Sequence, residues 1–261
     1  MKKVLIIESS PRKGFTRAAA EKLADKLGGS AQIETIHVYE EEIAMCGGCC
    51  ACLIAGSLKC PHHGDSAKKI LDKMMAADGV IYLIPNYALQ VPAGLKNLLD
   101  RLAFVFHRPR LFGKKTMVIV VEGVYGSRGI IKYVNEAMTF WGMETVKGTA
   151  LTGGVYPGRD PDRKTAETND RKLEDAAQRF LKALNSERPQ IPSIMQVFLF
   201  RAQRTGIRES AGALPADKAY FSEKGWFESP YYYPVRIGLA GRAAGSLADM
   251  LIGRQSRNGK S

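Results

Sequence analysis

The sequence predicts an α/β fold built around a doubly wound parallel sheet of five strands, followed by a C-terminal extension. Short apolar runs alternate with stretches of helical spacing through the first 185 residues, a pattern typical of parallel strands joined by right-handed crossover helices. The run at residues 79–84 is almost wholly apolar, as expected for a strand covered by helices on both faces. We therefore predict one α/β domain at residues 1–187 and an extension at residues 188–261.

Each expected strand is a short run of mainly apolar and β-branched residues. In chain order these runs are residues 4–7, 33–38, 79–84, 116–121 and 145–151. The expected helices carry apolar residues three or four positions apart, and some have boundary signals: Gly28 and Gly29 end the first, Ser66 is the expected N-cap of the second, and Pro92 opens the third. The five helices are residues 16–27, 66–77, 92–102, 131–141 and 163–184.

The extension differs in composition, since proline and aromatic residues interrupt it. Two amphipathic stretches remain, at residues 194–208 and 235–254. We expect them to pack against the chain's own domain or a second subunit, because the extension is rich in aromatic side chains, which favour burial. Contact with an anionic membrane surface is the alternative. Residues 188–261 hold eleven Lys and Arg against five Asp and Glu, so they carry +6 of the net charge of +12. A basic balance suits an anionic cofactor.

Composition bounds the class of protein. Hydrophobic residues make up 45% of the 261 residues, which is ample for a core, and no apolar run reaches the length of about 18 residues that suggests a transmembrane helix. The first apolar run ends at Glu8 and is too short for a signal peptide. Five clustered cysteines fit a reducing compartment better than a disulfide framework. We expect a cytoplasmic protein with no transmembrane segment and no nucleic-acid partner.

The turn after the first strand, residues 9–16, is a candidate phosphate site. Ser9 and Thr16 offer hydroxyls, Arg12 offers positive charge, and Gly14 permits a tight backbone. The turn leads into a helix, whose free N–H groups bind phosphate, and it lies at the carboxyl end of a strand, where such sheets bind ligands. An ordinary turn capped by Thr16 is the alternative. No G-x-G-x-x-G motif supports a dinucleotide Rossmann domain.

Four cysteines form a candidate metal site. Cys46, Cys49, Cys52 and Cys60 have the spacing C-x2-C-x2-C-x7-C, and compact thiolate spacing is what an iron–sulfur cluster needs. Zinc on the same sulfurs, with His62 or His63, and free or redox-active thiols are the alternatives, which spacing alone cannot separate. Cys50 lies outside the register.

Five motifs together resemble the flavodoxin-like NAD(P)H-dependent FMN reductase family. They are residues 9–16, 46–52, 77–81, 85–87 and 95–101, and the resemblance spans about residues 1–185. It implies the strand order 2-1-3-4-5 and FMN as cofactor. The cysteine spacing further resembles the iron–sulfur flavoprotein subset of that family, which implies a 4Fe–4S cluster on Cys46, Cys49, Cys52 and Cys60.

The resemblance also implies which residues hold FMN. The phosphate falls on the first loop, at Ser9, Arg12, Gly14, Phe15 and Thr16. The isoalloxazine ring packs along the loop after the third strand, at Pro85, Asn86, Tyr87 and Ala88. The loop after the fourth strand closes the polar edge of the ring, at Glu122, Gly123, Val124, Tyr125 and Gly126. Asn86 and Glu122 depart from the family's pattern, and a carboxylate beside the ring would disfavour the reduced flavin anion.

Two functions follow from this resemblance. The first is an FMN-dependent oxidoreductase that passes electrons from NAD(P)H through flavin to a small-molecule or protein acceptor. The second is an FMN/4Fe–4S electron carrier that exchanges electrons with a ferredoxin-like partner. A non-catalytic scaffold whose thiols hold zinc is a third hypothesis. Because flavin reductases of this fold commonly place the site at a subunit interface, we expect a homo-oligomer, either a dimer or a tetramer.

Overall fold

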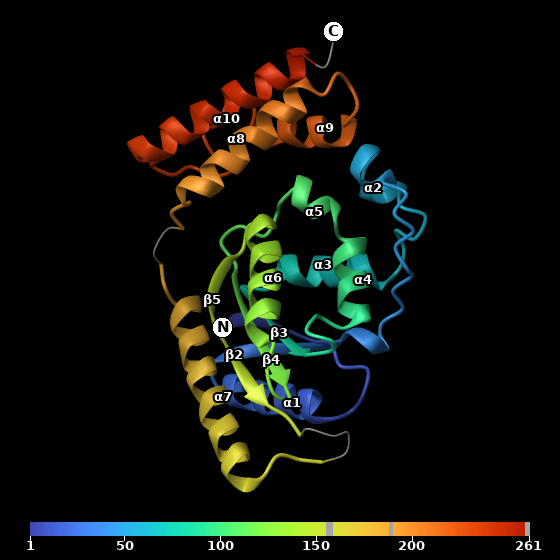
Figure 1. The fold of residues 1–261 in the computed structure, drawn as a ribbon, viewed down its shortest axis with the longest axis vertical. Coiled ribbons are helices and arrows are strands. Elements are labelled where there is room, and N and C mark those ends of the chain that lie inside the picture. Colours follow the sequence, from blue (N-terminus) through green and yellow to red (C-terminus); the bar gives the residue numbers. More distant parts are fainter. Residues whose placement is uncertain (155–158, 188–189, 259–261) are drawn as a thin grey trace. The chain divides into compact units, whose positions relative to one another are not determined.

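The computed structural model describes residues 1–154, 159–187 and 190–258, and the side chains within these ranges up to residue 255 (Figure 1). The chain groups into two compact units. The first consists of Met1–Gly47 and Gly64–Glu187, and the second consists of Gly48–His63 and Arg188–Ser261. The sequence analysis divided the chain only after residue 187 and did not anticipate that the segment bearing most of the cysteines would group with the extension.

The first unit contains one five-stranded sheet, and its strands are all parallel. The strand order is β2-β1-β3-β4-β5, which confirms the predicted doubly wound sheet. The strands are β1 (Lys2–Glu8), β2 (Ala31–His37), β3 (Gly79–Pro85), β4 (Lys115–Glu122) and β5 (Glu144–Thr152). Every residue of β3 is buried, as its apolar composition predicts.

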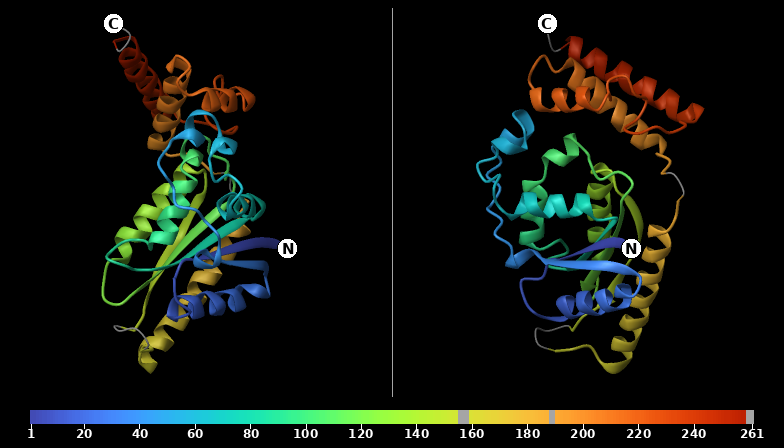
Figure 2. Two further views of the ribbon diagram at one scale, coloured as in Figure 1. Left: turned by 90° about the vertical axis from the view of Figure 1, so that its right-hand side faces the viewer. Right: turned by 180° about the vertical axis from the view of Figure 1, so that it is seen from behind.

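Helices cover both faces of this sheet (Figures 1 and 2). α1 (Phe15–Gly28) and α7 (Arg163–Leu184) pack together on one face, where Leu23, Leu27 and Phe180 join the buried core. The other face carries α3 (Ser66–Ala76), α4 (Ala93–Arg101) and α6 (Ser127–Phe140), with the short helix α5 (Phe104–His107) before β4. Both faces of the sheet are thus covered by helices. Because the five strands are parallel, their carboxyl ends all lie at the same end of the sheet.

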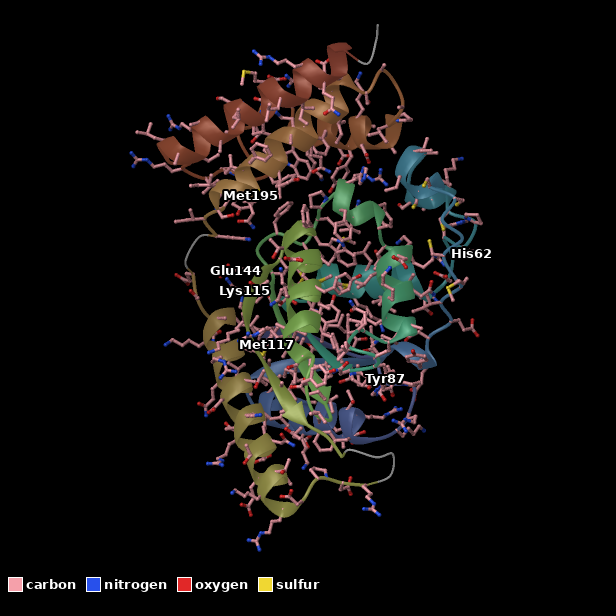
Figure 3. All side chains as sticks on the ribbon, in the orientation of Figure 1. His62, Tyr87, Lys115, Met117, Glu144 and Met195 are labelled. Carbon is pink, nitrogen blue, oxygen red and sulfur yellow. The ribbon has the colours of Figure 1, made fainter. Side chains whose placement is uncertain are left out.

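An ion pair joins β4 and β5 at the amino ends of the strands. Lys115 and Glu144 begin β4 and β5, and the Lys115 Nζ lies 2.5 Å from a carboxylate oxygen of Glu144 (Figure 3). Further along, the register between these strands shifts between Met117 and Ile119. A Cβ on Gly148 would lie 1.9 Å from the carbonyl oxygen of Val118, so only glycine fits at this irregularity.

The predicted N-cap at Ser66 is wrong, and the alternative in which Thr16 caps the first helix is not observed. Asp65, rather than Ser66, is the N-cap of α3, and its carboxylate accepts a hydrogen bond from the N–H of Ala67 at 3.1 Å. α1 begins at Phe15 with Gly14 as N-cap, and no side chain caps it, so Thr16 does not serve as the cap. Asp65 takes the capping position because a carboxylate favours the positive end of a helix.

The second unit is helical in its described part. It contains α2 (Ala51–Ile54), α8 (Ile194–Glu209), α9 (Pro215–Glu223) and α10 (Leu239–Asn258), and α8 packs along α10. The predicted amphipathic stretches correspond to α8 and α10, although α10 begins four residues later than expected, beyond Pro234. Helix α9 was not predicted. None of the helices in the described ranges is long and apolar enough to cross a membrane.

Hydrogen bonds between half-buried polar side chains and contacts between aromatic rings hold this unit together. The Asp249 carboxylate accepts hydrogen bonds from Arg201, Arg204 and Thr205, which ties α10 to α8. The ring of Phe200 meets those of Tyr231 and Tyr232 edge-on, with centroids 5.5 and 4.4 Å away. The aromatic residues of the extension thus form its core, as their enrichment predicts.

Candidate cofactor site

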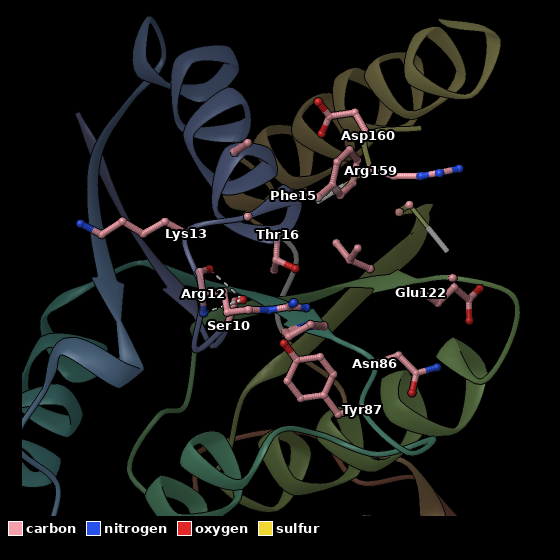
Figure 4. A pocket seen from close by; sticks show the side chains of 17 residues that line it. Ser10, Arg12, Lys13, Phe15, Thr16, Asn86, Tyr87, Glu122, Arg159 and Asp160 are labelled. Carbon is pink, nitrogen blue, oxygen red and sulfur yellow. Dashed lines mark hydrogen bonds between the residues drawn. The ribbon is translucent and has the colours of Figure 1, made fainter. Parts of the chain in front are cut away.

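A cavity of about 670 Å³ lies at the carboxyl edge of the sheet in the first unit (Figure 4). Four strand ends contribute to it, those of β1, β3, β4 and β5, as a doubly wound sheet predicts. The lining residues are Ser10, Arg12, Lys13, Gly14, Phe15, Thr16 and Ala18 after β1; Pro85, Asn86 and Tyr87 at the end of β3; Val121, Glu122 and Gly123 at the end of β4; and Gly153, Gly154, Arg159 and Asp160 after β5.

The turn after β1 presents hydrogen-bond donors to this cavity. Arg12, Thr16 and Tyr87 point into the cavity, whereas Lys13 points away from it (Figure 4). The Ser10 hydroxyl donates to the Arg12 carbonyl at 3.0 Å and fixes the turn. Because no side chain caps α1, the N–H groups of its first turn remain available to an anion at the positive end of the helix.

Ser9, which was predicted to bind phosphate, does not line the cavity. It is fully buried, and its hydroxyl donates to the carbonyl oxygen of Leu83 at 3.2 Å. Its backbone N–H donates to the same oxygen at 3.1 Å. Ser9 therefore joins the end of β1 to β3 and holds the start of the turn in place.

A buried carboxylate lies under the same turn and was missed by the sequence analysis. Glu8 is 1% exposed, accepts a hydrogen bond from the Ser10 N–H at 2.6 Å, and lies 3.0 Å from His37 Nδ1. Burial raises the pKa of the Glu8 carboxyl above its ordinary value, although the contacts with His37, Ser10 and Arg17 oppose the rise. Glu8 thus holds the turn in place through Ser10, although burial disfavours the charged form of its carboxyl.

We expect Glu8→Gln to change how stability depends on pH. A raised pKa means that, between the ordinary pKa and the raised one, the folded chain binds a proton that the unfolded chain has released. The contribution of Glu8 to the free energy of unfolding therefore falls as pH rises through that window. Urea unfolding from about pH 4 to pH 7 should show a smaller fall in the variant than in the parent. Parallel curves for the two proteins would contradict this assignment.

The loops after β3 and β4 are joined through Asn86. The Asn86 Nδ2 donates to the carbonyl oxygen of Tyr125 at 2.7 Å, and its buried Oδ1 has no hydrogen-bond partner in the described part of the chain. Gly126 has φ +114°, and a Cβ there would lie 2.6 Å from Asn86 Nδ2. Tyr125 and Gly126 do not line the cavity, and neither does Ala88, but the first two position Asn86, which does.

Glu122 lines the cavity and also closes the start of α6. One of its carboxylate oxygens accepts from the N–H of Ser127 at 2.7 Å, and the other accepts from the Ser127 hydroxyl at 2.8 Å. Both oxygens are thus turned to the positive end of a helix, which offsets part of their charge. The repulsion that a carboxylate would exert on a reduced flavin is correspondingly weaker than the sequence alone suggests.

The loop after β5 is part of the site that the sequence analysis did not include. Gly153 and Gly154 line the cavity, and Arg159 adds positive charge at its edge. Asn169 of α7 holds this strand end, because its side-chain amide exchanges hydrogen bonds with both backbone groups of Thr152. A pair of glycines directly after the fifth strand is the signal that could have found this loop.

The four cysteines fit a metal group by their chemistry but are not gathered in the structure. None of the four forms a disulfide; Cys49 is exposed and the other three are half-buried. Cys46 belongs to the first unit, and Cys49, Cys52 and Cys60 belong to the second. Across residues 1–154, 159–187 and 190–258, no three His, Cys, Asp or Glu side chains are grouped so that they could hold a metal ion. The donor set suits a thiolate-bound cluster or zinc.

Comparison with known proteins identifies similar families. A family model described as NADPH-dependent FMN reductase matches residues 2–156. An iron–sulfur flavoprotein of Archaeoglobus fulgidus is 29% identical over 231 residues, which cover 87% of this chain and 100% of that protein. An iron–sulfur flavoprotein of Methanosarcina thermophila is 33% identical over 162 residues, covering 59% of this chain and 81% of that protein.

A solved structure supports the fold. An FMN-dependent NADH-azoreductase from Bacillus anthracis, in complex with FMN, superimposes with a TM-score of 0.52 at 16% identity. The match covers 69% of this chain and 100% of the azoreductase. At this identity the likeness confirms the flavodoxin-like arrangement alone.

Proposed function

Because the chain belongs to the NADPH-dependent FMN reductase family and to its iron–sulfur flavoprotein subset, it is a flavin-dependent oxidoreductase, and we propose that the cavity of the first unit binds FMN. The observation that carries the proposal is the convergence of an uncapped helix start, Arg12 and Thr16 in one cavity at the switch point of the sheet. These are the groups that bind a phosphate dianion.

The rest of the cavity suits the ring of the cofactor. Pro85 and Tyr87 offer apolar surface, and the unpartnered Oδ1 of Asn86 is an acceptor for an N–H of a planar heterocycle. The volume of about 670 Å³ is typical of small-molecule sites. We propose that Arg12, Gly14, Phe15 and Thr16 hold the phosphate end, and that Pro85, Asn86, Tyr87, Glu122 and Gly123 border the ring.

The electrons are proposed to come from NAD(P)H and to pass to an acceptor that is either a small molecule or a protein. Bound FMN would supply the redox chemistry, by accepting a hydride and releasing electrons, and the chain supplies position and electrostatics. Arg12 and Arg159 place positive charge at the cavity, which suits both an anionic cofactor and a phosphate-bearing nicotinamide dinucleotide. No residue of the chain is assigned as a general acid or base.

Anaerobic reduction by nicotinamide tests this function. The purified protein should show the absorption of oxidised flavin. Adding NADPH or NADH under anaerobic conditions should reduce the flavin and bleach this absorption. Dithionite serves as the control, since it reduces any bound flavin. Bleaching by dithionite but by neither nicotinamide would overturn the NAD(P)H-dependent function and favour the electron carrier.

A second candidate is an electron-transfer flavoprotein with FMN and a 4Fe–4S cluster, working with a ferredoxin-like partner. Four thiols within fifteen residues, at Cys46, Cys49, Cys52 and Cys60, favour it, and two relatives are named iron–sulfur flavoproteins. The two functions share the cavity and differ in the source of electrons. Zinc and free thiols remain the alternatives for the cysteines.

We also propose that the protein works in the cytoplasm as a homo-oligomer. Five reduced thiols need a reducing compartment, which supports the first part. Apolar side chains left exposed near the start of α8, namely Ile191, Ile194, Met195 and Leu199, support the second, because such patches mark contact surfaces.

A further inference from the structure

We propose that Asp65, Asn97 and Arg101 form a clamp that closes the base of the cysteine-bearing segment and positions Cys46 as a metal ligand. The inference deepens the cluster assignment above and rests on it. All three residues belong to the first unit, as does Cys46. We name these three residues the α4 clamp, because Asn97 and Arg101 lie on α4. The clamp involves no contact between the two units.

Asn97 holds the backbone at the first cysteine. Its Oδ1 accepts a hydrogen bond from the N–H of Cys46 at 2.9 Å, and its Nδ2 donates to the carbonyl oxygen of Ala44 at 3.2 Å. The Asn97 side chain is nearly buried, so these bonds face little competition from water. A single side chain on α4 therefore fixes the residues that lead into Cys46.

Arg101 and Asp65 hold the two ends of the segment together. The Arg101 guanidinium makes a bidentate ion pair with the Asp65 carboxylate, at 2.5 and 3.2 Å, and donates to the Ala44 carbonyl at 3.0 Å. Asp65 also accepts from the N–H of Ala44 at 3.0 Å. The Arg101 and Asp65 side chains are 4% and 14% exposed. Bidentate pairs of this kind have strong directional preference.

The clamp therefore closes a loop that contains every cysteine after Cys46. Residue 44 precedes the first cysteine and residue 65 follows the last, and both are bonded to the same guanidinium. The N–H of Ser66 donates to the carbonyl oxygen of Glu42 at 3.0 Å and adds a backbone bond across the same base. Closing the loop in the folded chain removes part of the entropy that a cluster would otherwise have to overcome.

The side chain of Cys46 makes a weak contact with α4. Its Sγ donates to the carbonyl oxygen of Asp100 at 3.7 Å, a long hydrogen bond to sulfur. The bonds from Asn97 therefore hold the backbone at Cys46 more firmly than this contact holds the thiol. Asp100 follows Asn97 by three residues and Arg101 follows it by four. Residues at these spacings share one face of a helix, here α4.

The Asn97→Ala variant tests the clamp, with Lys68→Ala as the matched control. Lys68 lies on α3 and forms an exposed ion pair with Asp72, four residues further along the helix. In metal-free protein kept reduced, amide hydrogen exchange at residues 44–46 should be at least about fivefold faster in Asn97→Ala. After anaerobic reconstitution, that variant should hold less than about half the iron of the parent. Lys68→Ala should match the parent in both measurements.

Unchanged exchange and unchanged iron in Asn97→Ala would overturn the clamp. If Asn97→Ala does not fold, the pair Asp65→Asn with Arg101→Met replaces it, because exchanging both partners avoids an uncompensated buried charge; the same two measurements then apply. A parent protein that takes up no iron would overturn the cluster assignment and the metal-positioning role together. The exchange rates would still show whether the three residues hold the loop, so the two failures are distinguishable.

Discussion

Replacing Arg12 and Thr16 together by alanine should release FMN from the protein. Both side chains point into the cavity beside the uncapped start of α1, where the phosphate is proposed to lie (Figure 4). A hydrogen bond to a charged group contributes roughly 1.5–3 kcal/mol, so losing both donors should weaken FMN binding at least about tenfold, and by more if the two contributions add. Fluorescence titration of deflavinated protein with FMN measures the change directly.

A matched control is available on α7. Thr168 and Arg171 form an Arg–Thr contact of 3.4 Å there, outside the cavity, so replacing both by alanine removes the same residue types and the same charge. That control should bind FMN as the parent does, which separates a local effect from a loss of net positive charge. An Arg12→Ala/Thr16→Ala variant that keeps stoichiometric FMN after dialysis would show that the phosphate lies elsewhere.

Much of the first unit could be predicted because its elements follow from local pattern. β3 is apolar along almost its whole length and β4 is apolar from Met117 to Val121, which favours strands covered on both faces. The helices between them carry apolar residues at helical spacing. Once the sheet is known to be doubly wound, the carboxyl ends of its strands mark the site. Nine of the residues predicted for FMN line the cavity: Arg12, Gly14, Phe15, Thr16, Pro85, Asn86, Tyr87, Glu122 and Gly123.

Contacts between distant segments explain what the sequence could not predict. Glu8 appears in the sequence as the polar end of a strand, and only the register that pairs it with His37 of β2 reveals a buried carboxylate in contact with an imidazole. Asp65 displaces Ser66 as the cap of α3, and it also bonds Arg101, which lies 36 residues away. The role of Asn97 likewise depends on a contact 51 residues distant. Such pairings carry no periodic signal.

The segment of residues 48–63 shows the same limit at the level of domains. Its cysteine spacing predicts a compact ligand set, but spacing says nothing about which unit the segment joins. The structure groups it with the extension, where α2 contacts α9, a helix that was not predicted. A weak, short helix such as α9 has few apolar positions to mark it, and its proline at the first turn resembles a loop signal as much as a helix start.

Cysteine substitution is expected to have the second large effect. If Cys46, Cys49, Cys52 and Cys60 ligate a 4Fe–4S cluster, anaerobically purified protein should contain about four iron atoms per chain, and Cys49→Ser should remove nearly all of them. The Cys49 side chain is exposed, so its loss should cost the fold little while removing a ligand. Iron and acid-labile sulfide analysis provides the measurement.

Cys50→Ser is the control that the chain itself offers, since it changes the neighbouring thiol in the same way. Cys50 is exposed, has φ +57°, and its Sγ donates to the carbonyl oxygen of Gly48 at 3.5 Å, a bond that a serine hydroxyl can keep. This variant should retain the iron of the parent, because Cys50 lies outside the ligand register. Equal loss of iron in both variants would exclude the proposed ligand set. About one zinc per chain would instead support a structural zinc site, and the absence of both metals would leave free thiols, in which case electrons leave the flavin directly for the acceptor.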